Sequence, residues 1–262
     1  MDKSSVIGVI LGFIAVGVGM VLKGVSPAVL ANPAAILIII LGTIAAVAIA
    51  FPMSELKRVP ALFKILFGKE EKESVLDVIQ LFSDLAVVAR RDGLLALEAK
   101  LNEIEDTFLK SGLTLAIDGQ SPEYIRDVLD EEIDAMKERH HAGALIFTQA
   151  GTYAPTLGVL GAVIGLIAAL GNLSDTDLLG HAIAAAFVAT LMGIFTGYVL
   201  WHPFANKLKR KSKAEVKRKE IMIEGILSVL EGQPPRLIEQ KLAVYLPIKE
   251  RMLINSGEKA DE

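Results

Sequence analysis

Four long apolar runs are separated by polar stretches, and this pattern predicts a helical membrane protein. The runs cover about residues 6–22, 33–52, part of 142–171, and 178–201. A helix needs roughly 20 mostly apolar residues to cross about 30 Å of hydrocarbon. Lys23 follows the first run, and no small-residue cleavage site is evident, so we expect this run to be retained rather than removed as a signal peptide. We therefore predict an all-α, polytopic membrane protein with four transmembrane helices and a helical cytoplasmic domain.

The polar stretch between the second and third runs has helical periodicity. Residues 53–66 mix apolar and basic side chains, which is typical of a short amphipathic piece at a membrane surface. From residue 73 apolar positions recur every three or four residues until Gly93, and a second such stripe predicts a helix over 94–112. A third helix should begin at Ser121, a capping residue followed by proline. Gly143 is the one breaker between Tyr124 and Ala144, so we expect this helix to continue into the third apolar run.

After the fourth run we expect two more helices. The basic run "NKLKRKSKAEVKRK" leads into a helix that reaches about Leu230, and "EGQPPR" interrupts it. The segment "LIEQKLAVYL" then predicts a last helix, and the tail 255–262 has the composition of a disordered end. No segment alternates like a strand.

Charge and composition restrict the class further. The 262 residues are 52% hydrophobic with a mean hydropathy of +0.49, and the net charge is −4 with no cysteine. This balance suits spans plus a polar part, gives no basic field for nucleic acid, and excludes disulfides and thiolate chemistry. Basic residues follow the second and fourth runs, so the positive-inside rule places both termini and the long polar segment in the cytoplasm. The predicted domains are spans one and two (1–52), a cytoplasmic helical domain (53–141), spans three and four (142–203) and C-terminal cytoplasmic helices (204–262).

Small residues form narrow faces on the third and fourth runs. The third run has Gly158, Gly161 and Gly165, and the fourth has a four-residue ladder made of Ala185, Ala189, Gly193 and Gly197. Helices in lipid associate through close packing of such residues rather than through the hydrophobic effect. Ordinary packing within one subunit explains most of these positions, so they do not by themselves indicate a function.

Prolines and missing charges add to this picture. Pro155 lies within the third run and Pro203 just after the fourth. Each marks either a static kink or a place where a helix can bend and change its packing. The four runs contain threonines but no Asp, Glu, Lys or Arg. A conducting pathway would therefore need the acid of a partner. HExxH, phosphate-loop and nucleophile–base patterns are absent from the sequence, so we expect no enzyme activity, no cofactor and no metal site.

Five longer stretches stand out in the sequence: "ANPAAILIIILGT", "RRDGLLALE", "YAPTLGVLGAVIGLIAAL", "AFVATLMGIFTGYVLWHPFANKLKRKS" and "EGQPPRLIEQKL". Together they resemble the MotA/PomA family of flagellar stator subunits, and most closely its members from Bacillus-type bacteria. The resemblance covers almost the whole chain, with the motifs in the family's order.

This resemblance implies a partner and an arrangement. It implies a homopentamer around a dimer of a MotB-like subunit, whose single transmembrane helix supplies an aspartate, in the bacterial cytoplasmic membrane. Proton flow at that aspartate would turn the ring and drive flagellar motility through the rotor protein FliG. The residues that match the family's functional positions are Pro155, Pro203 and Thr190 on the ion pathway, and Arg90, Glu98 and Glu132 at the rotor contact.

The resemblance also bears on the choice of ion. Sodium-driven relatives carry threonine where this chain has Ala162 and Ala189. Sodium needs several oxygen ligands, whereas a proton needs an acceptor and a chain of waters. The absence of two hydroxyls favours protons, although Thr190 remains.

Two other classes stay open at this point. One is an energy transducer of the ExbB/TolQ type, which also relies on a partner's aspartate but usually has three spans. The other is a passive membrane scaffold in contact with lipid, which gives no reason for the two prolines. The four runs and the "WHP" and "EGQPPR" segments favour the stator.

Overall fold

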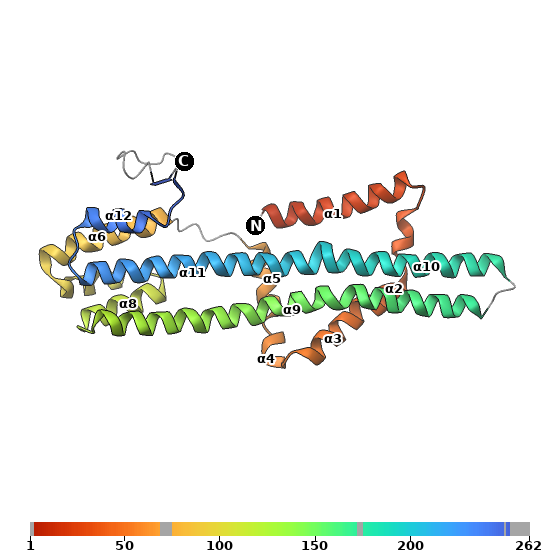
Figure 1. The fold of residues 1–262 in the computed structure, drawn as a ribbon, viewed down its shortest axis with the longest axis horizontal. Coiled ribbons are helices and arrows are strands. Elements are labelled where there is room, and N and C mark those ends of the chain that lie inside the picture. Colours follow the sequence, from red (N-terminus) through yellow and green to blue (C-terminus); the bar gives the residue numbers. More distant parts are fainter. Residues whose placement is uncertain (1–2, 69–74, 172–174, 249, 252–262) are drawn as a thin grey trace. The chain divides into compact units, whose positions relative to one another are not determined.

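The computed structural model describes residues 3–68, 75–171, 175–248 and 250–251, and throughout these residues the regular structure is helical (Figure 1). Contacts divide the chain into two compact units. We call them the apolar unit, residues 1–70 and 139–211, and the polar unit, residues 71–138 and 212–262. Within the described residues four helices are long and apolar enough to cross a membrane. The all-α prediction is therefore confirmed.

The apolar unit holds the predicted spans. The first is α1 (Lys3–Leu22), and the second is built from α2 (Pro33–Ile36), a π-helical segment η2 (Leu37–Leu41) and α3 (Gly42–Ala50). A 3₁₀ turn η1 (Pro27–Leu30) joins them, and α4 (Met53–Leu56) and α5 (Val59–Phe67) follow. The fourth span consists of α10 (Thr176–Phe195) and a π-helical segment η4 (Thr196–Trp201).

The polar unit holds shorter helices. They are α6 (Val75–Asp92), a 3₁₀ turn η3 (Leu94–Leu97), α7 (Glu98–Leu101), α8 (Thr107–Ile117) and α12 (Pro235–Ala243). Two helices contribute residues to both units: α9 (Pro122–Leu170) and α11 (His202–Leu230). The prediction that the helix capped by Ser121 continues into the third span is confirmed, and Ser121 Oγ accepts the amide of Tyr124 at 3.2 Å.

The two units do not follow the predicted domain boundaries. Residues 53–70 and 204–211 belong by contact to the apolar unit. The predicted boundaries describe where the chain leaves the membrane rather than which residues pack together, so they stay a prediction. The expected disorder at 255–262 lies outside the described residues.

Backbone contact joins α9 and α10, which run side by side in Figure 1. A Cβ built on Gly158 would lie 2.8 Å from the carbonyl oxygen of Ala189 and 3.0 Å from Cα of Gly193. The two helices therefore approach more closely than alanine at Gly158 would allow. Farther along, Gly165 faces Ala186 rather than Ala185. The predicted four-residue ladder was wrong at Ala185, because a helical face with 3.6 residues per turn advances by steps of three as well as four.

The second span packs on this helix pair through one stripe. Its buried residues recur every fourth position, and they are Ala35, Ile39, Thr43 and Val47. Beside the stripe, a Cβ at Gly42 would meet Leu157 at 3.2 Å, and one at Gly161 would meet Ile38 at 3.6 Å. The second span thus lies along α9 through a continuous contact.

Aromatic packing fixes α5 and α1. The ring of Phe63 on α5 meets Phe147 on α9 edge to face, with centroids 5.2 Å apart. On α1, Phe13 contacts Phe195 at 4.9 Å. Ser5 donates to the carbonyl of Leu66 at 3.2 Å, which ties the start of α1 to the end of α5. Most of α1 is nevertheless exposed in the single chain, as expected of a helix that faces lipid or another subunit.

The polar unit packs like a soluble domain around large apolar side chains. Phe82 and Phe108 are fully buried, and Gly225 presses against the ring of Phe82. The helix predicted over 94–112 was wrong. The chain breaks after α7, and Asp106 starts α8 by accepting the amides of Phe108 and Leu109 at 2.9 and 3.1 Å. Gly112, where the predicted helix was expected to end, lies inside α8. A Cβ there would lie 2.9 Å from Leu129, so close packing accounts for the glycine.

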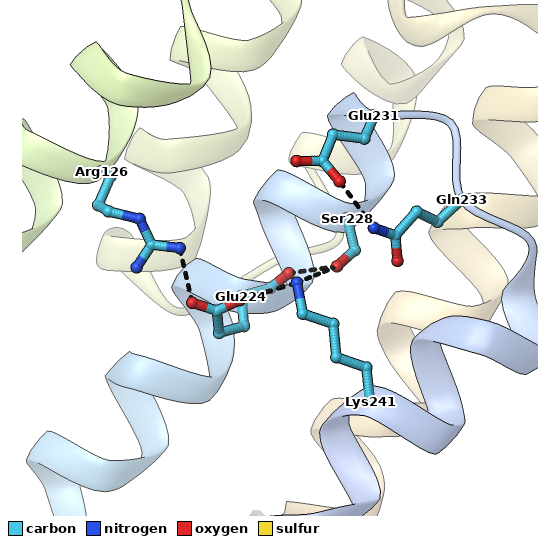
Figure 2. Close-up of polar contacts among 6 residues, drawn as sticks. All are labelled: Arg126, Glu224, Ser228, Glu231, Gln233 and Lys241. Carbon is cyan, nitrogen blue, oxygen red and sulfur yellow. Dashed lines mark hydrogen bonds and ion pairs between the residues drawn. The ribbon is translucent and has the colours of Figure 1, made fainter.

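A charged network ties three helices of the polar unit together (Figure 2). Glu224 on α11 pairs with Arg126 on α9 at 2.6 Å and with Lys241 on α12 at 2.8 Å. Lys241 also donates to Ser228 Oγ at 3.1 Å. Partial burial opposes ionisation of Glu224, but the hydrogen bonds from Lys241 and Arg126 outweigh it, so the pKa of Glu224 lies below its ordinary 4.5.

Replacing Glu224 with glutamine should lower the free energy of unfolding of the polar unit by about 1–2 kcal/mol at neutral pH, since two charged partners lose their acceptor. Because folding lowers the pKa of Glu224, its stabilisation is present above pH 4.5 and disappears as the pH falls through the folded value. Unfolding of the purified protein at several pH values measures this. Glu231→Gln is the control, because Glu231 is exposed and accepts a hydrogen bond from the uncharged side chain of Gln233. Equal losses in both variants would contradict the prediction.

Replacing Gly158 with alanine should force α9 and α10 apart and cost about 1–3 kcal/mol, as overpacking does in a tight interior. Gly180→Ala is the matched control, since a Cβ there has no atom within 4 Å and alanine favours the helix. The thermal stability of the purified protein in detergent, compared between the two variants, checks the expectation. A Gly158→Ala protein as stable as the control would show that the close approach is not required.

Candidate functional site

Pro155 lies where α9 and the fourth span are in backbone contact. A proline has no N–H, so the carbonyl of Gly151 lacks the hydrogen bond that residue 155 would otherwise donate. A Cβ at Gly197 would lie 2.8 Å from this carbonyl oxygen and 2.7 Å from Cγ of Pro155. Glycine at 197 therefore allows the fourth span to rest directly on the proline ring and on the carbonyl that the proline leaves free.

The fourth span changes its hydrogen bonding at this same point. The π-helical segment η4 begins at Thr196 and ends at Trp201, just before His202 and Pro203. His202 donates its amide to the carbonyl of Gly197, five residues earlier. Pro203 cannot donate to Val199, and a π-helical adjustment is one way in which a helix in lipid accommodates a proline. Such segments are rare and frequently occur at functional sites.

His202 completes a cluster around the proline. A Cβ at Gly151 would lie 2.8 Å from Cγ and Cδ2 of the His202 ring. Gly151, Pro155, Gly197 and His202 are thus in mutual contact across two helices, and we call them the proline seam. The sequence singled out Pro155 and Gly197 but assigned no role to His202. The contact with Gly151 was missed, and the glycine four residues before the proline is the one signal that pointed to it.

The ion-pathway candidates beyond the prolines lie near the seam. Ala189 is buried against Gly158 and Gly161, in an apolar cluster with Ala35 and Ile39. A hydroxyl at position 189 would enter this apolar cluster, which gives a packing reason for alanine. Thr190 is half-buried and donates to the carbonyl of Ala186 at 3.2 Å, while Ala162 on α9 is half-buried. Their role on an ion pathway stays a prediction.

The chemistry available at the seam is limited. Neither 142–171 nor 178–201 contains an acidic or basic side chain apart from His181. The hydroxyl groups are mostly used within their own helix, as Thr148, Thr152 and Thr196 donate to carbonyls three or four residues earlier. The described residues include no group of three His, Asp or Glu that could hold a metal ion. His202 is the one titratable side chain of the seam, which contains no carboxylate.

The rotor-contact candidates lie in the polar unit. Arg90 is near the end of α6 and Glu98 is the first residue of α7, and both are exposed. Gly93 between them has a φ of +85°, which a residue with a side chain rarely adopts, and Leu97 is fully buried. The turn is therefore anchored while both charges reach solvent. Glu132 is exposed on α9, a different helix from those that carry Arg90 and Glu98.

Comparison with known proteins identifies the family. The sequence model of the MotA/TolQ/ExbB proton channel family matches residues 100–221, and the motility protein A N-terminal model matches residues 6–93. Motility protein A of Bacillus subtilis (strain 168) is 65% identical over 100% of this chain and 99% of its own length.

Solved structures agree with the sequence comparison. The flagellar MotAB stator complex from Bacillus subtilis contains a chain with a TM-score of 0.93 and 67% identity, which covers 97% of this chain and 99% of its own. A chain of C. jejuni MotAB has a TM-score of 0.90 and 33% identity, and covers 95% of this chain and 97% of its own.

These matches decide between the classes left open by the sequence. The family model over 100–221 is shared with TolQ and ExbB, but the model over 6–93 is specific to motility protein A, and the relative above carries that name over the full length. The ExbB/TolQ-like transducer and the passive scaffold are therefore not favoured. The chain belongs to the motility protein A (MotA) family of flagellar stator subunits.

Proposed function

We propose that this chain forms the wall of a proton pathway whose titrating acid is supplied by a MotB-like partner, and that the proline seam converts proton transfer into torque on the rotor. The observation that carries the proposal is a seam of glycine, proline and histidine beside apolar stretches, residues 142–171 and 178–201, that contain no carboxylate. A charged residue at the centre of a span costs about 2.5–3.5 kcal/mol on insertion scales, so a wall without charge makes the ionised form of the partner's acid costly and its protonated form favourable.

The energy of one transfer is sufficient for a step. One elementary charge that crosses 100 mV releases about 2.3 kcal/mol, several times the thermal energy. Protonation removes the charge of the partner's aspartate and lowers its cost against the apolar wall. The helices that form the wall then change their packing at Pro155 and at the π-helical segment before Pro203, where the helical hydrogen bonds are already interrupted.

The remaining parts of the proposal follow the family. Five copies surround a partner dimer in the cytoplasmic membrane, with both termini and the polar unit in the cytoplasm. Arg90, Glu98 and Glu132 contact the rotor protein FliG, and the chain has no enzyme activity and no cofactor. Ala162 and Ala189 leave too few oxygen atoms for a sodium site beside Thr190, so the coupling ion is the proton.

Expression of this chain with its partner should restore swimming to a bacterium that lacks its own stator. Swimming speed should follow the proton gradient, falling when a protonophore is added, and it should stay constant when potassium replaces sodium. Speed that followed sodium instead would overturn the choice of ion. Normal membrane levels of both subunits without any swimming would overturn the stator function.

Two substitutions should separate the pathway from the rotor contact. Pro155→Ala restores the missing N–H and should reduce both torque and ion flux, because the seam loses its interrupted hydrogen bond. Charge reversal at Arg90 or Glu98 should reduce torque while ion flux persists, and the effect of a single exposed charge is small. Torque on a tethered cell and cytoplasmic acidification measure the two quantities. Pro33→Ala is the control, since a proline in the first turn of a helix breaks no hydrogen bond. Unchanged torque in Pro155→Ala would exclude a role of the proline seam in torque generation.

A further inference from the structure

Two polar groups are buried in the apolar unit without a hydrogen bond. Thr43 is 4% exposed, and its Oγ1 makes no hydrogen bond to any described residue. The indole Nε1 of Trp201 is equally buried and is also unpaired within the described residues. Buried polar atoms in proteins almost always have a partner, whether a protein group or an ordered water. Two exceptions in one apolar unit therefore need an explanation.

Thr43 differs from the other threonines of the spans. Five of them donate their hydroxyl to a carbonyl three or four residues earlier in their own helix, and they are Thr148, Thr152, Thr156, Thr190 and Thr196. This local bond is the usual way for a threonine to enter a hydrophobic helix. Thr43 does not make it, so its hydroxyl is available to a group outside its helix.

The packing places both groups in the same region. Thr43 lies on the buried stripe of the second span between Ile39 and Val47. Trp201 packs against the cluster that contains Ile39 and also against the cluster that contains Val47. Those clusters include Ala154 and Ala150 on α9, so Trp201 packs beside the part of the stripe that contains Thr43.

Each group also lies beside an irregular part of its helix. The π-helical segment η2 ends two residues before Thr43, and η4 ends at Trp201. A π-helical segment shifts the backbone hydrogen bonds by one residue, and the carbonyls affected in this way are commonly satisfied by side chains or ordered water in membrane proteins. Each polar group therefore lies next to a stretch of altered backbone hydrogen bonding.

We propose that Thr43 and Trp201 form a binding site for one water molecule between the second and fourth spans. The water oxygen accepts a hydrogen bond from the indole N–H of Trp201, and the water also forms a hydrogen bond with the Thr43 hydroxyl. Its third partner is a carbonyl of a π-helical segment. Two to four polar partners are what a buried water requires. The site couples the second span to the segment just before Pro203, and it does not depend on which ion the complex carries.

Solid-state NMR of the complex in lipid tests the site. Trp201 is the only tryptophan of the chain, so one indole resonance belongs to it, and Trp201→Phe identifies that resonance in ¹⁵N-tryptophan-labelled complex. The proposal expects rapid transfer of magnetisation from water to the indole N–H. The transfer should be lost in Thr43→Val and retained in Thr43→Ser, which keeps the hydroxyl.

Thr148→Val is the matched control, because Thr148 uses its hydroxyl within its own helix, and the transfer should persist in this variant. Absence of transfer in the unmodified complex would overturn the proposal, whether the indole is unbonded or bonded directly to Thr43. Persistence of transfer in Thr43→Val would overturn it as well, since the water would then be held without the threonine.

Discussion

Direct backbone contact between α9 and the fourth span is the constraint on which the apolar unit depends. Helices in lipid gain nothing from burying leucine against leucine, so their association relies on close approach. Gly158 and Gly193 allow this close approach at one point along the helix pair. Gly197, which packs against Pro155, allows it at a second point. The stripe of the second span packs on the surface that this pair creates, and Ala189 owes its burial to the same contact.

The two units are stabilised by different interactions. The polar unit has large buried side chains such as Phe82 and Phe108, and charged groups such as Glu224 that connect three helices. The apolar unit combines small residues, prolines and π-helical segments, so its helices are interrupted where they touch. Such interruptions reduce the cost of a local rearrangement, and this is why we assign movement to the seam and force transmission to the polar unit.

Sequence reasoning succeeded where one physical signal dominated. The spans were predictable because no charge interrupts them, and the junction of α9 with the third span was predictable because Ser121 caps the helix and no proline lies between Pro122 and Pro155. It failed over 94–112, where a leucine stripe suggested one helix but Asp106 caps a new one. Gly112 was misread because the same residue serves as a terminator or as a close contact, and only the position of Leu129 decides which.

Only part of the proline seam could be predicted from the sequence. Pro155 and the glycines were visible as residue types, whereas the contact between Gly151 and His202 depends on how two distant segments align. The unpaired state of Thr43 could not be foreseen, since most threonines in apolar helices bond to their own backbone. The roles of Arg90, Glu98 and Glu132 rest on family resemblance, because exposure alone does not distinguish a contact residue from a solvated one.

Proton flux through liposomes tests the central claim most directly. The claim is that this chain supplies the wall of the pathway while the titrating acid belongs to its partner. The chain reconstituted alone should give no flux above that of empty liposomes, and addition of the partner, freed of any segment that closes the pathway, should produce flux that disappears when its aspartate is replaced by asparagine. Robust proton flux through the chain alone would contradict the account.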